Sequence, residues 1–163
     1  MANLITSEQI KTVVTAVNAF DPSFFDTSIQ WIEDTIISCI LTPAYYADLV
    51  AKVALLPGIP LSANDQAVYD IVINAESYAV AYASYEKDLE RKTANQGIME
   101  NHTQWSKSAA ATSASRTLAK IKEREFHYCK QLGDYLIDNE ATYPLFDIDL
   151  IGYDPNFRRF FPL

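Results

Sequence analysis

Two glutamates, Glu86 and Glu125, are the residues of this sequence whose placement could support acid–base chemistry. Each falls within the apolar stripe of an expected helix, where a charged side chain is unusual. One interpretation is a pair of catalytic carboxyls whose pKa values are displaced by a shared apolar environment. The other interpretations are a structural pair bonded to tyrosine, lysine or arginine, and charges at the rim of a subunit interface. Because apolar stripes drift along a helix, we favour the structural pair.

Metal and nucleotide sites are not predicted. The nearest approach to the Glu-x-x-His pairs of helical di-iron proteins is Glu123, Glu125 and His127, at the wrong spacing. The four glycines are isolated, so the clustered glycines of phosphate-binding loops are absent. The sequence also contains neither a serine-hydrolase elbow nor a zinc-protease helix motif. We therefore expect no metal, no cofactor and no enzymatic activity.

The two cysteines, Cys39 and Cys129, predict buried and reduced thiols, because they lie far apart and each is flanked by apolar or aromatic residues.

The first residues lack the basic start and apolar run of a secretory signal. No stretch reaches the roughly 18 to 20 apolar residues of a membrane span. These features predict a protein made in the cytoplasm, without a membrane partner.

The formal net charge of −8 predicts a chain that repels free nucleic acid at long range. Five basic residues do gather in the second half, but Glu123 and Glu125 interrupt them. We expect these five to form a solvated helix face rather than a nucleic-acid surface: Arg116, Lys120, Lys122, Arg124 and Lys130. Five tyrosines at helical spacings are expected to fill the core and interfaces rather than to stack on bases: Tyr45, Tyr46, Tyr78, Tyr82 and Tyr85.

The elements that must position these residues are expected to be helices. Thr6 and Gln9 have capping-box spacing for a first short helix. An Asp-Pro pair at 21–22 and a Thr-Pro pair at 42–43 start the second and third helices. Apolar residues of the second helix, which should run to about residue 41, recur at spacings of three and four. They predict one stripe facing a core: Phe25, Ile29, Ile32, Ile36, Cys39 and Ile40.

The fourth helix, ending near residue 92, is apolar on nearly all sides and is therefore expected at the centre of the bundle. A fifth helix should begin at Ser113 or Ser115 and run to about Asn139. Residues 93–112 between them show neither a helical period nor a clear strand. We predict that they form a long loop or hairpin-like excursion.

The last segment, residues 147–163, is predicted to be an extended arm beside a helical domain of residues 1–146. It carries residue types that often dominate interface energies, set among prolines: Tyr153, Phe157, Arg158, Arg159, Phe160 and Phe161. The arm either folds over its own bundle or docks on another subunit, and we favour docking.

The expected fold class is all-α, a bundle of about five helices with a long loop between the last two and an extended C-terminal arm.

Several stretches carry a family resemblance. They are the opening "MANLITSEQI", the central "SYAVAYASYEKDL", the turn "NQGIMEN" and the closing "EFHYCKQLGDYLIDNEATYPLF". Together they resemble the head–tail connector (adaptor) proteins of tailed phages, particularly those of Bacteroidetes-infecting and crAss-like phages. The matching positions are packing and turn residues, and none is a catalytic signature.

The resemblance implies a structural virion protein at the head–tail junction, made in the cytoplasm of the bacterial host. Such connectors form a ring, commonly twelve-fold, below the portal, extend the DNA channel and offer a platform for the tail. The expected partners are further copies of the chain, the portal protein, and tail or further ring proteins. DNA would pass through the lumen without specific binding, which the acidic charge fits because few cations would hold its phosphates.

The resemblance also makes one loop a candidate portal or subunit contact: Gly97, Ile98, Met99 and Trp105. The aromatic arm is a second candidate, for an adjacent subunit or a tail protein, on composition alone. Two alternatives to a connector stay open. One is a non-viral helical module that binds a single partner through its C-terminal arm. The other is an enzyme using Glu86 and Glu125, in which replacing both with glutamine should abolish turnover.

Overall fold

The computed structural model describes residues 3–96 and 104–151, and the side chains of residues 3–88 and 113–151. Every element in the described residues is helical and none is a strand, which confirms the all-α prediction. Five helical rods form the bundle: α1 (Ser7–Val13), α2 (Ser23–Ile32) continuing through α3 (Ser38–Leu41), α4 (Pro43–Val53), α5 (Ala63–Gln96) and α6 (Gln104–Asp138). Single turns of 3-10 helix accompany them: η1 (Thr15–Val17), η3 (Glu140–Thr142) and η4 (Ile148–Leu150).

Side-chain caps fix the starts of the first two helices. The predicted capping box of α1 is confirmed, since Gln9 N donates to Thr6 Oγ1 at 3.3 Å and Thr6 N donates to Gln9 Oε1 at 2.8 Å. At α2, Asp21 Oδ1 accepts from the backbone N of Ser23 at 2.9 Å. Hydrogen bonds from the Ser23 side chain and backbone lower the pKa of Asp21. The caps place both helix starts within about a residue of the prediction.

A turn of π-helix, η2 (Glu33–Ile37), joins α2 to α3. The predicted core stripe of this rod is confirmed, because its aromatic and isoleucine members are buried, while Cys39 is half-buried. The extra residue in the π turn shifts the helical repeat, and both Ile36 and Ile37 face the core. Glu33, the first residue of this turn, is buried with them.

The chain bends sharply between α3 and α4. Thr42 has a φ of 63°, a backbone conformation that is strained for a β-branched residue. Its side-chain hydroxyl donates to the backbone oxygen of Leu145 at 3.4 Å.

Within the described ranges no single helix has the length and apolar composition of a membrane span. The segments Ser23–Leu41 and Pro43–Val53 have that length and composition only as a combined pair, and the chain bends by 117° between them.

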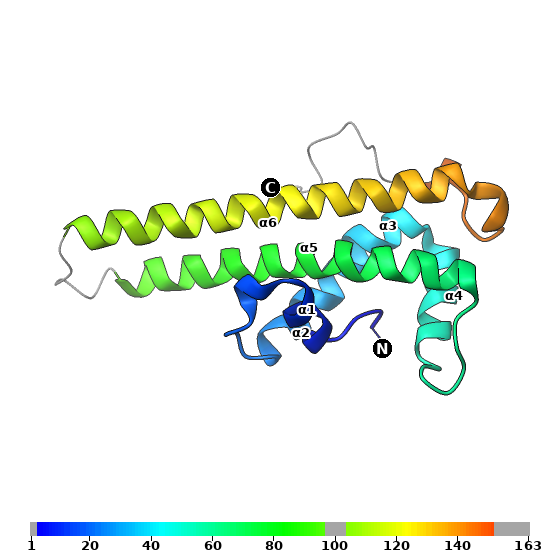
Figure 1. The fold of residues 1–163 in the computed structure, drawn as a ribbon, viewed down its shortest axis with the longest axis horizontal. Coiled ribbons are helices and arrows are strands. Elements are labelled where there is room, and N and C mark those ends of the chain that lie inside the picture. The colour runs from blue at the N-terminus through cyan, green and yellow to red at the C-terminus, as the bar shows by residue number, and fades with distance from the viewer. Residues whose placement is uncertain (1–2, 97–103, 152–163) are drawn as a thin grey trace.

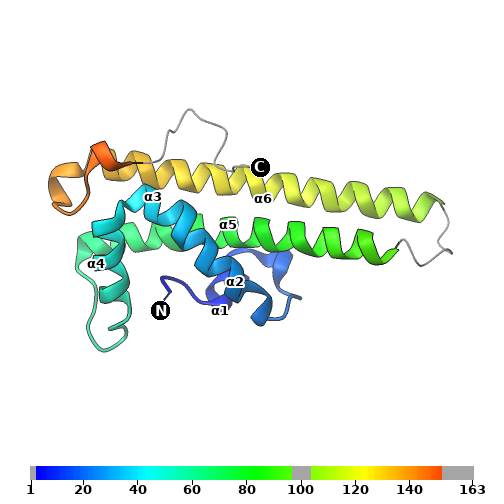
Figure 2. The ribbon, with the colours of Figure 1, turned by 180° about the vertical axis from the view of Figure 1, so that it is seen from behind.

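Helices α5 and α6 run side by side along the long axis of the molecule, and α5 lies between α6 and the layer formed by α1 and α2 (Figure 1; Figure 2). The 34 residues of α5 span about 50 Å. Its central position is the one that the sequence predicted, with buried residues on several sides: Val68, Val72, Ala75, Ala79, Val80 and Ala81. The C-terminal end of α5 and the N-terminal end of α6 extend beyond α1 and α2 as a projecting pair (Figure 1).

The predicted loop over residues 93–112 is wrong in its extent. Helix α5 continues to Gln96, and α6 begins at Gln104 rather than at Ser113 or Ser115. The stretch has no apolar stripe, but it is rich in alanine, which has the highest helix propensity. The pairing of α6 with α5 further stabilises the helix. The backbone of Trp105 therefore belongs to the first turn of α6. Three further predicted contact residues lie outside the described residues: Gly97, Ile98 and Met99.

The predicted arm of residues 147–163 starts as a turn rather than as extended chain. Residues 148–150 form η4, and Asp147 Oδ1 caps it by accepting from the backbone N of Asp149 at 3.0 Å. The aromatic and arginine residues of the arm lie outside the described residues: Tyr153, Phe157, Arg158, Arg159, Phe160 and Phe161. Their docking stays a prediction.

Candidate functional site

Glu33 is fully buried and ties several elements together. Its Oε1 accepts from the backbone N of Leu4 at 2.5 Å, and its Oε2 accepts from the Tyr46 hydroxyl at 2.9 Å. The Tyr69 hydroxyl donates to the Leu4 carbonyl oxygen at 3.0 Å, which fixes the same segment from α5. Burial, and then the bond to Glu33, raise the pKa of Tyr46, so its hydroxyl remains a donor. Glu33 thereby joins the N-terminal segment, α4 and the α2–α3 rod.

Glu76 of α5 is fully buried beside Glu33, and neither of its carboxyl oxygens has a hydrogen-bond partner in the structure. Burial raises the pKa of Glu76 well above its ordinary value, and the adjacent charge of Glu33 raises it further. Glu33 accepts from two donors, whereas Glu76 accepts from none. A charge on Glu76 this close to Glu33 would be very costly in the core, so we expect Glu76 to hold its proton in the folded protein.

The carboxyls predicted as a pair, Glu86 and Glu125, lie on the facing helices α5 and α6 but differ in burial. Glu125 is only 8% exposed, whereas Glu86 is exposed and accepts from the Tyr82 hydroxyl at 3.5 Å. Burial raises the pKa of Glu125 to about 7; Lys122 opposes this rise and Glu86 adds to it. The prediction of two stripe carboxyls is thus right for Glu125 and wrong for Glu86.

A carboxyl acts as a catalytic acid or base only where a substrate can reach it. Glu33, Glu76 and Glu125 are all buried, and none of them lines either of the two grooves described below. A raised pKa is a property of catalytic acids, but at Glu76 and Glu125 burial is its main cause, with an adjacent carboxylate adding to it. We assign these three carboxyls to the fold.

Cys129 lies one helical turn after Glu125 and is buried, while Cys39 is half-buried, so the prediction of two buried thiols is right only for Cys129. Burial, together with the Glu125 charge, raises the pKa of Cys129. A Cys39→Ser variant should therefore leave no thiol that reacts with DTNB in the folded protein, and one that reacts after unfolding in urea. Rapid labelling of this variant without denaturant would contradict the structure, and Cys129→Ser is the matched control.

A polar network closes one end of the bundle. Lys52 pairs with Asp48 at 2.6 Å and with Asp65 at 3.0 Å. Asp65 also accepts from the hydroxyls of Ser62 at 2.8 Å and Tyr45 at 3.4 Å. Burial opposes the ionisation of Asp65, but the bonds from Ser62 and Lys52 outweigh it and lower its pKa. A groove of about 190 Å³ lies beside this network, and the charges along it are already paired with one another.

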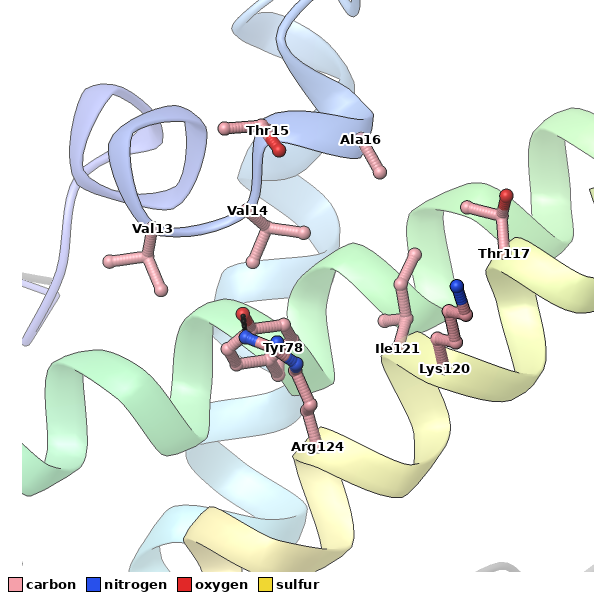
Figure 3. Close-up of a pocket in the computed structure, with 9 residues that line it drawn as sticks. All are labelled: Val13, Val14, Thr15, Ala16, Tyr78, Thr117, Lys120, Ile121 and Arg124. Atoms are coloured by element: carbon pink, nitrogen blue, oxygen red, sulfur yellow. Dashed lines mark hydrogen bonds between the residues drawn. The ribbon is translucent and has the colours of Figure 1, made fainter.

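A second groove, of about 270 Å³, opens where the end of α1 and η1 meet α5 and α6 (Figure 3). The buried residues Val14, Ile121 and Tyr78 form its floor, while Lys120 and Arg124 project from α6 at its side. Arg124 Nη1 donates to the Tyr78 hydroxyl at 2.9 Å, and its guanidinium lies 5.7 Å from the ring centroid. We call this site the basic groove. Its volume is below the range of about 300–1,000 Å³ that is typical of binding sites for drug-sized ligands.

The five basic residues of α6 divide among different positions. Arg116, Lys120 and Arg124 are spaced by four, so they share one helix face beside the basic groove. Lys122 lies instead over a tyrosine ring of α5, 5.2 Å from its centroid, and Lys130 forms an ion pair of 2.7 Å within α6. The predicted solvated cluster is therefore a stripe of three cations with two outliers.

Several large apolar side chains are exposed in the described part of the chain, and many of them lie in the connections at one end of the long helices. They are Leu55 and Ile59 between α4 and α5, and Leu145, Ile148 and Leu150 after α6. Figure 1 shows both connections at the end opposite the projecting pair. In the second connection, residues 147–150 alternate aspartate with exposed isoleucine and leucine. We call these four residues the acidic turn.

Comparison with known proteins places the chain in a family. A model described as a family of unknown function, DUF6712, matches residues 22–150. The chain belongs to the DUF6712 family. The family match runs from α2 to η4, so it includes the acidic turn and the three buried glutamates but not α1. No curated protein and no solved structure matches the chain.

Glu33 and Glu76 are the polar core residues of this DUF6712 member that sequence reasoning missed. A signal was present, since Glu33 lies four residues after Ile29 and Glu76 four residues after Val72, both buried. A helix that is apolar on nearly all sides shows no single stripe, however, so a lone glutamate in it does not stand out. The π turn obscures the signal of Glu33 in the same way by shifting the repeat.

Proposed function

We propose that this DUF6712 protein is a head–tail connector (adaptor) of a tailed-phage virion. In this proposal it is a structural protein that forms a homo-oligomeric ring below the portal, extends the DNA channel and docks the tail. The observation that carries the proposal is the exposure of large apolar side chains in the two connections at one end of the long helices, where Leu55, Ile59 and Leu150 are 53%, 58% and 61% exposed. Each connection thereby offers apolar side chains to another protein.

The long α5–α6 pair supports the same proposal. It is about 50 Å long and projects beyond α1 and α2, so it offers lateral surface to neighbours at a distance from the core (Figure 1). Helix pairs of this kind can stand side by side as the wall of a ring. The sequence resemblance supplies the specific assignment to connectors, and the candidate portal contacts around Trp105 and in the C-terminal arm belong to that assignment.

The charge balance is compatible with a channel for DNA. With a net charge of −8 per chain, a ring of many copies would carry a large negative charge. Such a ring would hold phosphates weakly, because each lysine or arginine contact to DNA adds salt-dependent affinity. In this proposal DNA therefore slides through the ring without specific binding.

The proposal is tested by the mass of the protein alone and with the portal protein encoded in the same genome. We expect light scattering to show one multi-subunit complex containing portal and several copies of this chain per portal ring. A chain that stays monomeric and does not bind portal would contradict the proposal. A complex with one copy of an unrelated partner would instead favour a helical module that binds a single protein.

A further inference from the structure

We propose that the acidic turn of one copy docks into the basic groove of the next copy, so that the chain assembles head to tail. This inference rests on the proposed ring and assigns its subunit contact to two surfaces that the structure describes. It names a second copy of this chain as the occupant of the basic groove. Charge complementarity between Lys120 and Arg124 of the groove and Asp147 and Asp149 of the turn is its basis.

The acidic turn combines two carboxylates with two exposed aliphatic side chains, which suits a small groove beside exposed cations. Ile148 and Leu150 are 39% and 61% exposed, and Asp147 and Asp149 alternate with them. The 3.0 Å bond from Asp149 N to Asp147 Oδ1 holds the turn in shape. A turn that is already ordered loses less conformational freedom on docking than a flexible segment does.

The basic groove offers the matching features. Its volume of about 270 Å³ suits one or two aliphatic side chains better than a larger ligand. Val14 and Ile121 form the floor of the groove and are only 3% and 4% exposed, so the contact rests mainly on the exposed cations at its side. Lys120 is exposed at the side of the groove, and Arg124 is held there by its bond to Tyr78. Cations beside an apolar site set the orientation and the association rate of a partner that carries carboxylates.

The two surfaces do not meet within one molecule. None of residues 147–150 lines the basic groove. Arg124 lies fourteen positions before Asp138, the last residue of α6, which corresponds to about 21 Å along the helix. The contact must therefore join different copies. Because it uses two different surfaces, it is a heterologous contact, which produces a closed ring when the rotation between copies closes.

Charge reversal provides the test. Lys120→Glu with Arg124→Glu reverses the groove, and Asp147→Lys with Asp149→Lys reverses the turn. Each variant alone places like charges at the contact, and we expect it to need at least about tenfold more protein for half-assembly, measured by sedimentation with and without portal protein. An equimolar mixture of the two variants should recover assembly, because each reversed surface then meets its complement. A single chain with all four changes should recover it as well.

The matched control is Lys122→Glu with Lys130→Glu, which reverses two charges of α6 outside the groove and should leave assembly unchanged. Thermal unfolding by circular dichroism checks that every variant is folded. If the reversed variants assemble as the native chain does, this contact is overturned while the proposed ring stands. If the native chain never associates, with or without portal, both proposals are overturned.

Nucleic acid is the competing occupant of the three-cation stripe, and one further measurement separates it. Fluorescence anisotropy with a short DNA duplex should show no binding to the native chain at physiological salt. Binding that the Lys120→Glu, Arg124→Glu variant abolishes, together with unchanged assembly of that variant, would overturn the docking of the acidic turn.

Discussion

Replacing Glu76 with glutamine should raise the free energy of unfolding at pH 8, because the amide stays neutral in the core without binding a proton. Both oxygens of the Glu76 carboxyl lack a hydrogen-bond partner, and Glu33 lies beside it. A glutamine amide is neutral and can donate to the Glu33 carboxylate. The variant therefore keeps the shape of the side chain and removes the need to hold a proton in the core.

The pH dependence of this variant follows from the direction of the pKa shift. The folded protein keeps Glu76 protonated above its ordinary pKa of 4.5, whereas the unfolded chain releases that proton. Glu76 therefore lowers stability progressively as the pH rises above about 4.5, and glutamine does not. Urea unfolding at pH 4.5 and pH 8 should show the gain mainly at pH 8.

The matched variant, Glu33→Gln, should have the opposite sign. Glutamine is neutral and has one acceptor oxygen in place of two, so when that oxygen accepts from Leu4 N, the amide NH2 faces the Tyr46 hydroxyl, which must then accept rather than donate. Hydrogen bonds to a charged group contribute about 1.5–3 kcal/mol and neutral ones about 0.5–1.5 kcal/mol, so we expect a loss of about 1–3 kcal/mol at pH 8. Equal effects of the two variants would contradict the different roles of Glu33, which accepts two hydrogen bonds, and of Glu76, which holds a proton.

Glu125→Gln should stabilise the protein at pH 8 by about 3 kcal/mol, which is the free energy equivalent of a pKa raised from 4.5 to about 7. The folded state holds this proton up to about pH 7, and the unfolded state releases it near pH 4.5. The destabilisation thus accumulates between these two pH values and is constant above them. Below pH 4.5 the variant and the native chain should have nearly equal stability.

The control for Glu125→Gln is Glu123→Gln, an exposed residue of the same helix whose replacement should change stability little at any pH. Denaturant titrations at half-unit pH steps from 4 to 8 would record the profile. A gain that is independent of pH would show that packing, rather than the buried charge, limits stability at this position.

Sequence patterns predicted the parts of this fold that depend on local chemistry. The capping box at Thr6 and the apolar stripe from Phe25 to Ile40 follow from periodicity and cap residues alone, and both are confirmed. The central position of α5 follows from its apolar composition in the same way. These features need no knowledge of which helix packs against which.

The parts that failed depend on tertiary pairing. The alanine- and serine-rich start of α6 has no stripe of its own, and pairing with α5 adds to the helix propensity of its alanines. The basic groove and the acidic turn were not predicted as sites because each depends on how separate segments meet. The groove combines η1, α5 and α6, and the turn is exposed only because nothing in the described chain covers it.

The most direct test of the connector proposal is electron cryomicroscopy of the native chain bound to its portal protein. We expect a closed ring of copies coaxial with the portal, with the acidic turn of each subunit against the basic groove of its neighbour and an open bore through the centre. Single copies scattered on the portal surface, or a portal that remains bare, would contradict the connector proposal.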